Sequence, residues 1–278
     1  MSQGTLRMTF RIDTIATTRK PGIESEALAP TMMHESDRPN PENLMPMLLV
    51  SARNLREAIT AARAGADLID LKEPAHGALG RCDETIWQAV AEKLRGMKPL
   101  SAALGEWDEW DRLDDERVQE ILTMLEGFDF AKIGPCGSAM DDGAGLKRAY
   151  DRLRSLGPKG LRWIAVVYAD QERAGALPRQ RILDMARNCG FQGILIDTFD
   201  KSRPHFWGPV WSRFVQNSID EGMLVAIAGG LTIKNIRLFG DMEPHWFAVR
   251  GAACARGERN GQVSYRRVMK LARSLERR

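Results

Sequence analysis

The 278-residue chain lacks several features that would place it in a common functional class. It has no run of 18 or more apolar residues, so the sequence predicts no transmembrane helix. Its start does not show the basic-then-apolar order of a secretory signal. The net charge is only +3, and lysines and arginines are spread along the chain, so no nucleic-acid surface is indicated. We therefore expect a cytoplasmic protein that binds neither nucleic acid nor a membrane.

Cysteine and histidine are also scarce, with four of each in the whole chain. The cysteines are widely separated and none forms a CxxC pair, which is typical of reduced thiols in a cytosolic protein. The histidines do not show the HExxH spacing of a zinc enzyme. We therefore expect no metal site.

What the chain does contain, from Met45 onward, is a regular alternation of short apolar runs and amphipathic helical stretches. The apolar runs are 46–51, 67–72, 99–104, 128–133, 162–168, 192–197, 223–228 and 245–250. The helical stretches lie near 54–65, 83–95, 114–126, 143–156, 178–189, 208–221, 232–239 and 264–276. Strict alternation predicts parallel strands joined by right-handed crossovers, and eight such units predict a (β/α)8 TIM barrel over residues 45–278.

An open doubly wound sheet is the alternative fold. It normally carries a glycine-rich turn after its first strand. Here the first strand is followed by Ser51-Ala52-Arg53-Asn54, which contains no glycine, and this favours the barrel.

Residues 1–42 differ from the rest of the chain. They combine prolines with Ser, Thr, Glu and Asp and show little periodicity, which indicates a disordered N-terminal extension rather than a second domain. Met45 or Met47, where the first strand begins, is an alternative start for the chain.

An acid and an amine interrupt the second apolar run, which reads "LIDLK" at residues 68–72. Successive strand side chains point to opposite faces, so Leu68, Asp70 and Lys72 share one face and Ile69 and Leu71 share the other. Helices cover the outside of a barrel, and the purely apolar pair should meet them. Asp70 and Lys72 are therefore predicted to point inward near the C-terminal end of the strand, where barrel active sites lie.

Two further strands repeat this arrangement. Lys132 points inward from the fourth, Asp197 from the sixth, and Lys201 follows in the loop above Asp197. Three lysines and two aspartates from strands 2, 4 and 6 are thus predicted to converge over one barrel mouth. The structural alternative is a set of buried ion pairs without catalytic function, although burying charge in this way is costly.

Clustered cations have chemical consequences. Neighbouring positive charge and partial desolvation both favour the neutral form of a lysine amine. A neutral amine can attack a carbonyl and form a Schiff base. The same cluster would attract a phosphorylated carbonyl compound.

A phosphate site is predicted after the seventh and eighth strands, where Gly229-Gly230 and Arg250-Gly251 follow. Glycines let the backbone approach a ligand closely, and loops at this place are the usual phosphate site of the fold. A lone Gly-Gly pair is also common in ordinary turns. The pairing of the two positions favours the phosphate interpretation.

These residues resemble the (5-formylfuran-3-yl)methyl phosphate synthase family of methanofuran biosynthesis, also called 4-(hydroxymethyl)-2-furancarboxaldehyde-phosphate synthase. The resemblance runs from about Met47 to the C-terminus. It rests on "MLLVSARNLREAITAARAGADLIDLKEPAHGALG", "FAKIGPCG", "GILIDTFDKS" and "VAIAGGL". It implies condensation of two molecules of glyceraldehyde 3-phosphate with loss of phosphate and water, and no metal or organic cofactor.

The resemblance also implies roles for the charged cluster. Lys72 would form the Schiff base, and Asp70, Lys132, Asp197 and Lys201 would transfer protons or stabilise charge. A class I aldolase, a phosphosugar isomerase and a non-catalytic barrel that binds a phosphorylated ligand remain alternatives. The sequence leaves the oligomeric state open, a homo-oligomer included.

Overall fold

A computed structural model describes residues 46–203, 207–236, 239 and 242–275 of the chain. Within these residues, eight parallel strands pair in chain order and the last pairs with the first, so that the sheet closes into a barrel. The predicted (β/α)8 barrel is confirmed. The strands are β1 (Met47–Ala52), β2 (Leu68–Leu71), β3 (Leu100–Glu106), β4 (Phe130–Gly134), β5 (Arg162–Tyr168), β6 (Gly193–Asp197), β7 (Leu224–Ile227) and β8 (Trp246–Val249).

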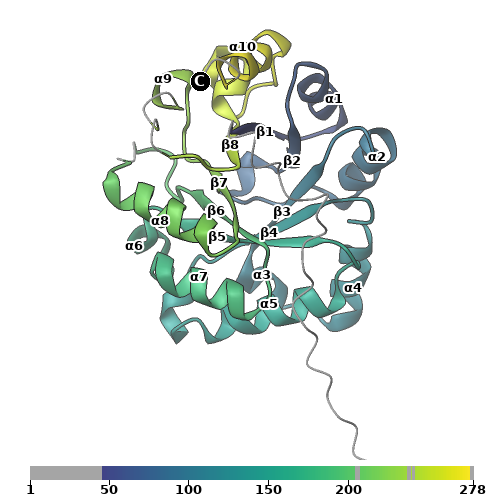
Figure 1. Cartoon of the computed structure of the whole chain (residues 1–278). Helices are drawn as coiled ribbons and strands as arrows, with labels where there is room; N and C mark the ends of the chain where they lie inside the picture. The colour runs from purple at the N-terminus through teal and green to yellow at the C-terminus, as the bar shows by residue number, and fades with distance from the viewer. Residues whose placement is uncertain (1–45, 204–206, 237–238, 240–241, 276–278) are drawn as a thin grey trace, which may run out of the picture. The chain divides into compact units, whose positions relative to one another are not determined.

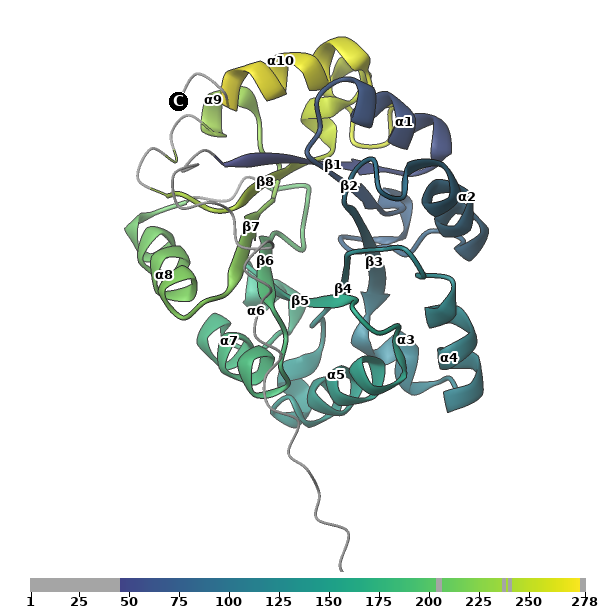
Figure 2. The same cartoon turned by 45° about the vertical axis from the view of Figure 1, so that its right-hand side comes forward.

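Helices surround this ring of strands, as Figure 2 shows. One helix follows each strand, at the place predicted by the sequence pattern. They are α1 (Leu55–Arg63), α2 (Glu84–Leu94), α4 (Asp115–Thr123), α5 (Ala144–Leu156), α7 (Arg179–Asn188), α8 (Pro209–Asp220), α9 (Ile233–Ile236) and α10 (Tyr265–Leu275). The pattern did not predict two short helices that lie in the loops after β3 and β5 (Figure 1), α3 (Trp107–Asp111) and α6 (Gln171–Ala174).

Local sequence sets where several helices begin. The side chain of Asn54 accepts a hydrogen bond from the backbone N–H of Glu57 (3.0 Å) and caps α1. Asp114 caps α4 in the same way by accepting from the N–H of Arg117 (2.8 Å). Such caps satisfy N–H groups that the first turn of a helix leaves free, and each stabilises its helix by about 1 kcal/mol.

The strands separate an outer apolar core from the barrel interior. Ile69 and Leu71 of β2, like Ala131 and Ile133 of β4, are buried in the core between strands and helices. Asp70 and its neighbours of the same parity point inward instead. The predicted side-chain directions are therefore confirmed.

An apolar layer closes the interior below the charged residues. It surrounds a small cavity of about 30 Å³, against which the stem of Lys132 also lies. Side chains from several strands fill this layer, as is usual in such barrels. They include Leu49, Leu68, Phe130, Ile164, Ile194, Leu195, Leu224 and Trp246.

The N-terminal extension predicted for residues 1–42 lies outside the described residues. Of the helices in the described ranges, none has the length and apolar character needed to cross a membrane.

Candidate active site

A cavity of about 390 Å³ opens at the carboxyl ends of the strands. This is the end of the barrel at which active sites of the fold lie, and the volume is within the usual range for small ligands. All nine predicted site residues line it: Asp70, Lys72, Lys132, Asp197, Lys201, Gly229, Gly230, Arg250 and Gly251.

Asp70 and Lys132 form a buried ion pair deep in the cavity. Their side chains are 1% and 4% exposed, and the lysine Nζ donates to Oδ1 of the aspartate. Two serines complete the contacts: Ser51 donates to the other Asp70 oxygen at 3.0 Å, and Lys132 Nζ also donates to Oγ of Ser101 at 2.8 Å. Every polar atom of the pair therefore has a partner that fixes its position.

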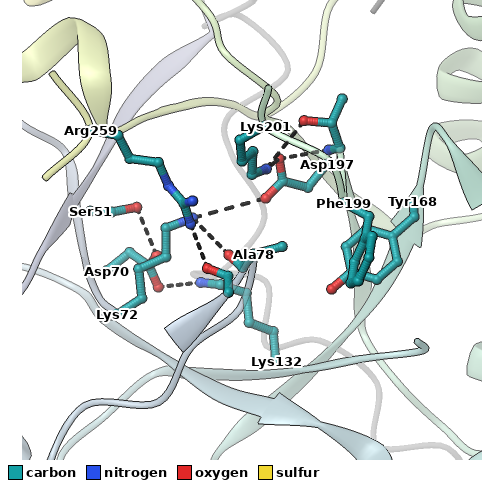
Figure 3. Close-up of polar contacts among 12 residues, drawn as sticks. Ser51, Asp70, Lys72, Ala78, Lys132, Tyr168, Asp197, Phe199, Lys201 and Arg259 are labelled. Carbon is teal, nitrogen blue, oxygen red and sulfur yellow. Dashed lines mark hydrogen bonds and ion pairs between the residues drawn. The ribbon is translucent and has the colours of Figure 1, made fainter. Parts of the chain in front are cut away.

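The second group is built around Asp197, whose carboxylate lies between two amines. Lys201 donates to Oδ1 of Asp197 and, at 3.3 Å, to the hydroxyl of Thr198. Lys72 Nζ lies 3.9 Å from the other oxygen, Oδ2, and donates a long hydrogen bond of 3.4 Å to the carbonyl of Ala78. Figure 3 shows the Lys72 amine between the Asp70–Lys132 pair and the Asp197–Lys201 pair.

Burial and charge shift the ionisation of these groups. Burial lowers the pKa of Lys132, although Asp70 opposes the shift. Burial also lowers the pKa of Lys201 to about 8, with Asp197 opposing and the positive charge of Lys72 adding to the change. For Asp197, burial alone would raise the pKa, but the charges of Lys201 and Lys72 outweigh it and the pKa is lowered.

The three lysines differ in how firmly their amines are held. Lys132 and Lys201 each donate directly to a carboxylate, which favours the ammonium form and fixes it in place. Within the described ranges, the amine of Lys72 makes only contacts of 3.4 and 3.9 Å. Among the described residues, Oδ2 of Asp197, the oxygen nearest to Lys72, accepts no hydrogen bond. A weakly held amine beside a free carboxylate oxygen is suited to nucleophilic attack with proton transfer to the neighbouring base.

Arg250 lines the cavity, but its guanidinium is held by the protein. Nε donates to the carbonyl of Arg259 (2.9 Å), and Nη1 donates to the carbonyl of Ser51 (2.9 Å) and to Glu57. Nη2 donates to Glu57 (3.2 Å) and to the carbonyl of Gly261 (2.7 Å). A guanidinium has five N–H donors, and these five contacts occupy them. The side chain of Arg250 therefore anchors its loop and has no donor left for a phosphate, contrary to the sequence-based expectation.

The predicted glycines line the cavity at positions that a side chain would obstruct. Gly229 and Gly230 have φ of 96° and 68°, values that favour glycine. A Cβ on Gly229 would lie 3.0 Å from Cγ2 of Thr198, and one on Gly251 would lie 3.1 Å from the carbonyl oxygen of Gly257. The backbone at both places is thus exposed to the cavity without an intervening side chain, while a phosphate-binding role stays a prediction.

Several lining residues were not predicted from the sequence. Ser51 and Thr198 line the cavity and Ser101 lies beside it, and all three contact the charged groups; nothing in the sequence distinguished these hydroxyl residues from others in or beside apolar strands. Arg259, half-buried, lines the cavity from the loop after β8, where the sequence shows no strand or helix period. Only the folded loop brings it to the site.

A further acid, the half-buried Glu106, lies near the same end of the barrel but outside the cavity lining. Glu106 accepts from the hydroxyl of Tyr168 and, at 2.9 Å, from the backbone N–H of Cys136. Burial raises the pKa of Glu106, although both hydrogen bonds oppose the shift. Tyr168 in turn packs edge to face on Phe199, with ring centroids 5.3 Å apart, as Figure 3 shows.

No group of three or more His, Cys, Asp or Glu side chains is arranged to hold a metal ion in the part of the chain that the structure describes. The expectation that the protein uses no metal and no organic cofactor stays a prediction.

Comparison with known proteins gives a consistent assignment. A family model described as 4-HFC-P synthase matches residues 48–272. The (5-formylfuran-3-yl)methyl phosphate synthase of Methanopyrus kandleri is 30% identical over 239 residues, which cover 84% of this chain and 100% of that protein. A protein of the same name from Methanococcus maripaludis is 29% identical over 225 residues, covering 77% of this chain and 92% of that protein.

Solved structures match in fold. Phosphoribosyl anthranilate isomerase from Thermus thermophilus superimposes with a TM-score of 0.58, covering 83% of this chain and 98% of that chain. Its sequence identity is 14%, so the similarity concerns the fold alone.

Proposed function

Because the chain belongs to the 4-HFC-P synthase family, we propose that it condenses two molecules of glyceraldehyde 3-phosphate to (5-formylfuran-3-yl)methyl phosphate. The product keeps one phosphate, and one inorganic phosphate and two water molecules leave, which balances the atoms. The reaction is a carbon–oxygen lyase reaction that needs no net oxidant or reductant. The product would serve the synthesis of a methanofuran-type carrier of one-carbon units.

The observation that carries this proposal is the weakly held amine of Lys72 beside the free Oδ2 of Asp197, at 3.9 Å. Lys72 attacks the aldehyde carbon of one substrate, and loss of water gives an imine. The imine makes the proton on the adjacent carbon acidic, because the resulting electron pair is delocalised onto nitrogen as an enamine. Asp197, whose pKa is lowered, is ionised at neutral pH and is placed to accept that proton.

The enamine accounts for the loss of one phosphate. In glyceraldehyde 3-phosphate the phosphate is on the second carbon from the aldehyde, so the enamine electrons expel it as the C–O bond breaks. Lys201 and Lys132 stabilise negative charge in these steps, since preorganised cations in a buried site favour an anionic transition state. The second substrate molecule then keeps its phosphate and forms the new carbon–carbon bond.

Two measurements test the proposal. Incubation with glyceraldehyde 3-phosphate should produce a furan ultraviolet absorption band and release one inorganic phosphate for each furan formed. Borohydride added with the substrate should reduce the imine and add mass to the peptide that contains Lys72. Mass found only on Lys132 or Lys201 would assign the nucleophile to another lysine, and Lys72→Met is the control that should not be labelled.

The alternatives give different outcomes in the same experiment. A class I aldolase or a phosphosugar isomerase would consume the substrate without a furan band or stoichiometric phosphate. A non-catalytic phosphate-binding barrel would give no adduct and no turnover.

A further inference from the structure

The charge balance of the cavity indicates which of its cations is available to a phosphate. Six arginines and lysines line it. Lys72 and Lys201 contact Asp197, Lys132 contacts Asp70, Arg203 lies 3.8 Å from Asp200, and Arg250 contacts Glu57. Within the described ranges, Arg259 alone among the six contacts no carboxylate.

Arg259 is held at the cavity by backbone groups. Its Nη2 donates to the carbonyl of Gly77, and its own carbonyl accepts from Nε of Arg250 at 2.9 Å. Gly77 has φ of 113°, a backbone conformation that favours glycine and that sets the direction of this carbonyl. The next carbonyl, that of Ala78, accepts from Lys72, so one turn positions both cations. Figure 3 shows the guanidinium of Arg259 directed toward Lys72 and Asp197.

The site therefore carries an excess of positive charge. Around the centre of the cavity, the four cations Lys72, Lys132, Lys201 and Arg259 accompany the two carboxylates of Asp70 and Asp197, an excess of two positive charges. A phosphate monoester carries about −1.5 to −2 at neutral pH, which matches this excess. The guanidinium keeps N–H donors beyond the one bound to Gly77, and arginine binds phosphate well through paired donors.

We propose that Arg259 binds a substrate phosphate and thereby determines that the enzyme acts on phosphorylated aldehydes, while the Arg250–Glu57 ion pair anchors the loop that carries Arg259. This inference rests on the proposed function for the identity of the aldehyde. The binding of phosphate by Arg259 can be measured without it.

Inorganic phosphate is the probe for binding. In a thermal shift titration, phosphate should raise the melting temperature of the wild-type protein, because a ligand that binds only the folded state stabilises it. Arg259→Gln should need roughly 10- to 100-fold more phosphate for the same shift, the loss expected for a hydrogen-bonded charge. Arg259→Lys keeps the charge but not the paired N–H donors of the guanidinium, so the phosphate concentration it needs should lie between those of the wild type and Arg259→Gln. Arg266→Gln removes the same charge from an exposed position of α10 and should match the wild type.

Borohydride trapping tests specificity. Arg259→Gln should need roughly 10- to 100-fold more glyceraldehyde 3-phosphate for half-maximal trapping and should trap unphosphorylated glyceraldehyde as well as the wild type does. Equal loss with both aldehydes, a fall in the ligand-free melting temperature that Arg259→Lys does not restore, or an unchanged phosphate response would overturn the proposal. No trapping by the wild type, with the phosphate response still lost in Arg259→Gln, would refute the proposed function and leave the phosphate site standing.

Discussion

The Asp70–Lys132 pair predicts an unusual stability pattern. From the sequence alone, burying a lysine lowers the free energy of unfolding, so Lys132→Met is expected to leave that free energy unchanged or to raise it. The structure reverses this expectation, because the substitution leaves Asp70, 1% exposed, with Ser51 as its remaining side-chain partner. Removing one member of such a pair costs about 3–5 kcal/mol of unfolding free energy.

Lys201→Met is the matched control, since it also removes a cation from the site. Asp197 would keep the backbone N–H of Thr198 at 2.8 Å and Lys72 at 3.9 Å. The expected cost is therefore limited to about 1.5–3 kcal/mol, the range for one hydrogen bond to a charged group.

The double variant Asp70→Asn/Lys132→Met completes the cycle. It leaves no unpaired charge at this pair, so it should lose less unfolding free energy than Lys132→Met does. Its loss should also be much smaller than the sum of the losses of Asp70→Asn and Lys132→Met. Urea unfolding of the wild type, Asp70→Asn, Lys132→Met and the double variant gives the free energies of the cycle. Turnover should stay lower than that of the wild type by orders of magnitude in the double variant, because the preorganised cation is gone. A Lys132→Met protein as stable as the wild type, or strict additivity in the cycle, would refute the reasoning.

Three further predictions follow from other features. The pKa of Lys201 is lowered to about 8, so kcat/KM should fall as pH rises through about 8 if the ammonium form of Lys201 stabilises charge. Lys201→Arg should remove that fall, because arginine keeps its charge. A pH–rate profile of both proteins would check this. Burial raises the pKa of Glu106, so the folded protein binds the proton of this carboxyl group more tightly than the unfolded chain does. Protonated Glu106 therefore stabilises the fold at low pH, and this stabilisation is lost as pH rises through the raised pKa. Glu106→Gln should therefore unfold with a flatter pH dependence than the wild type and gain relative stability toward neutral pH; equal slopes in urea titrations would contradict this. A chain shortened to begin at Met45 should keep the melting temperature and turnover of the full chain, because the closed barrel begins at Met47, and a large loss of either would show that residues 1–42 contribute to the folded domain.

The fold and the central charged cluster could be predicted because they depend on local periodicity. Alternation along "LIDLK" determines that Asp70 and Lys72 share the inner face, and the order of strands determines that the strand ends meet. The short helices α3 and α6 were missed because they occupy one or two turns inside loops, where no apolar repeat can be recognised.

The roles of the two loop arginines could not be predicted, because pairing over long sequence separations leaves no local pattern. Glu57, which binds Arg250, is 193 residues away along the chain. Both arginines follow β8, and the sequence pattern drew attention only to Arg250, which comes directly after the strand. Only the contacts distinguish Arg250, whose donors are all occupied, from Arg259, which lacks a carboxylate partner among the described residues.

The closure of the barrel has a consequence for synthesis of the protein. β1 pairs with β8, and the ion pair between Glu57 and Arg250 crosses the same seam. On the ribosome, β1 and β7 therefore present unpaired edges until the residues from Trp246 onward have emerged, and such edges bind other chains readily. Contacts of this sequence separation also form slowly. Lys72 and Lys132 are thus translated long before the segment that closes the barrel around them, and we expect the nascent chain to be prone to aggregation until its last strand arrives.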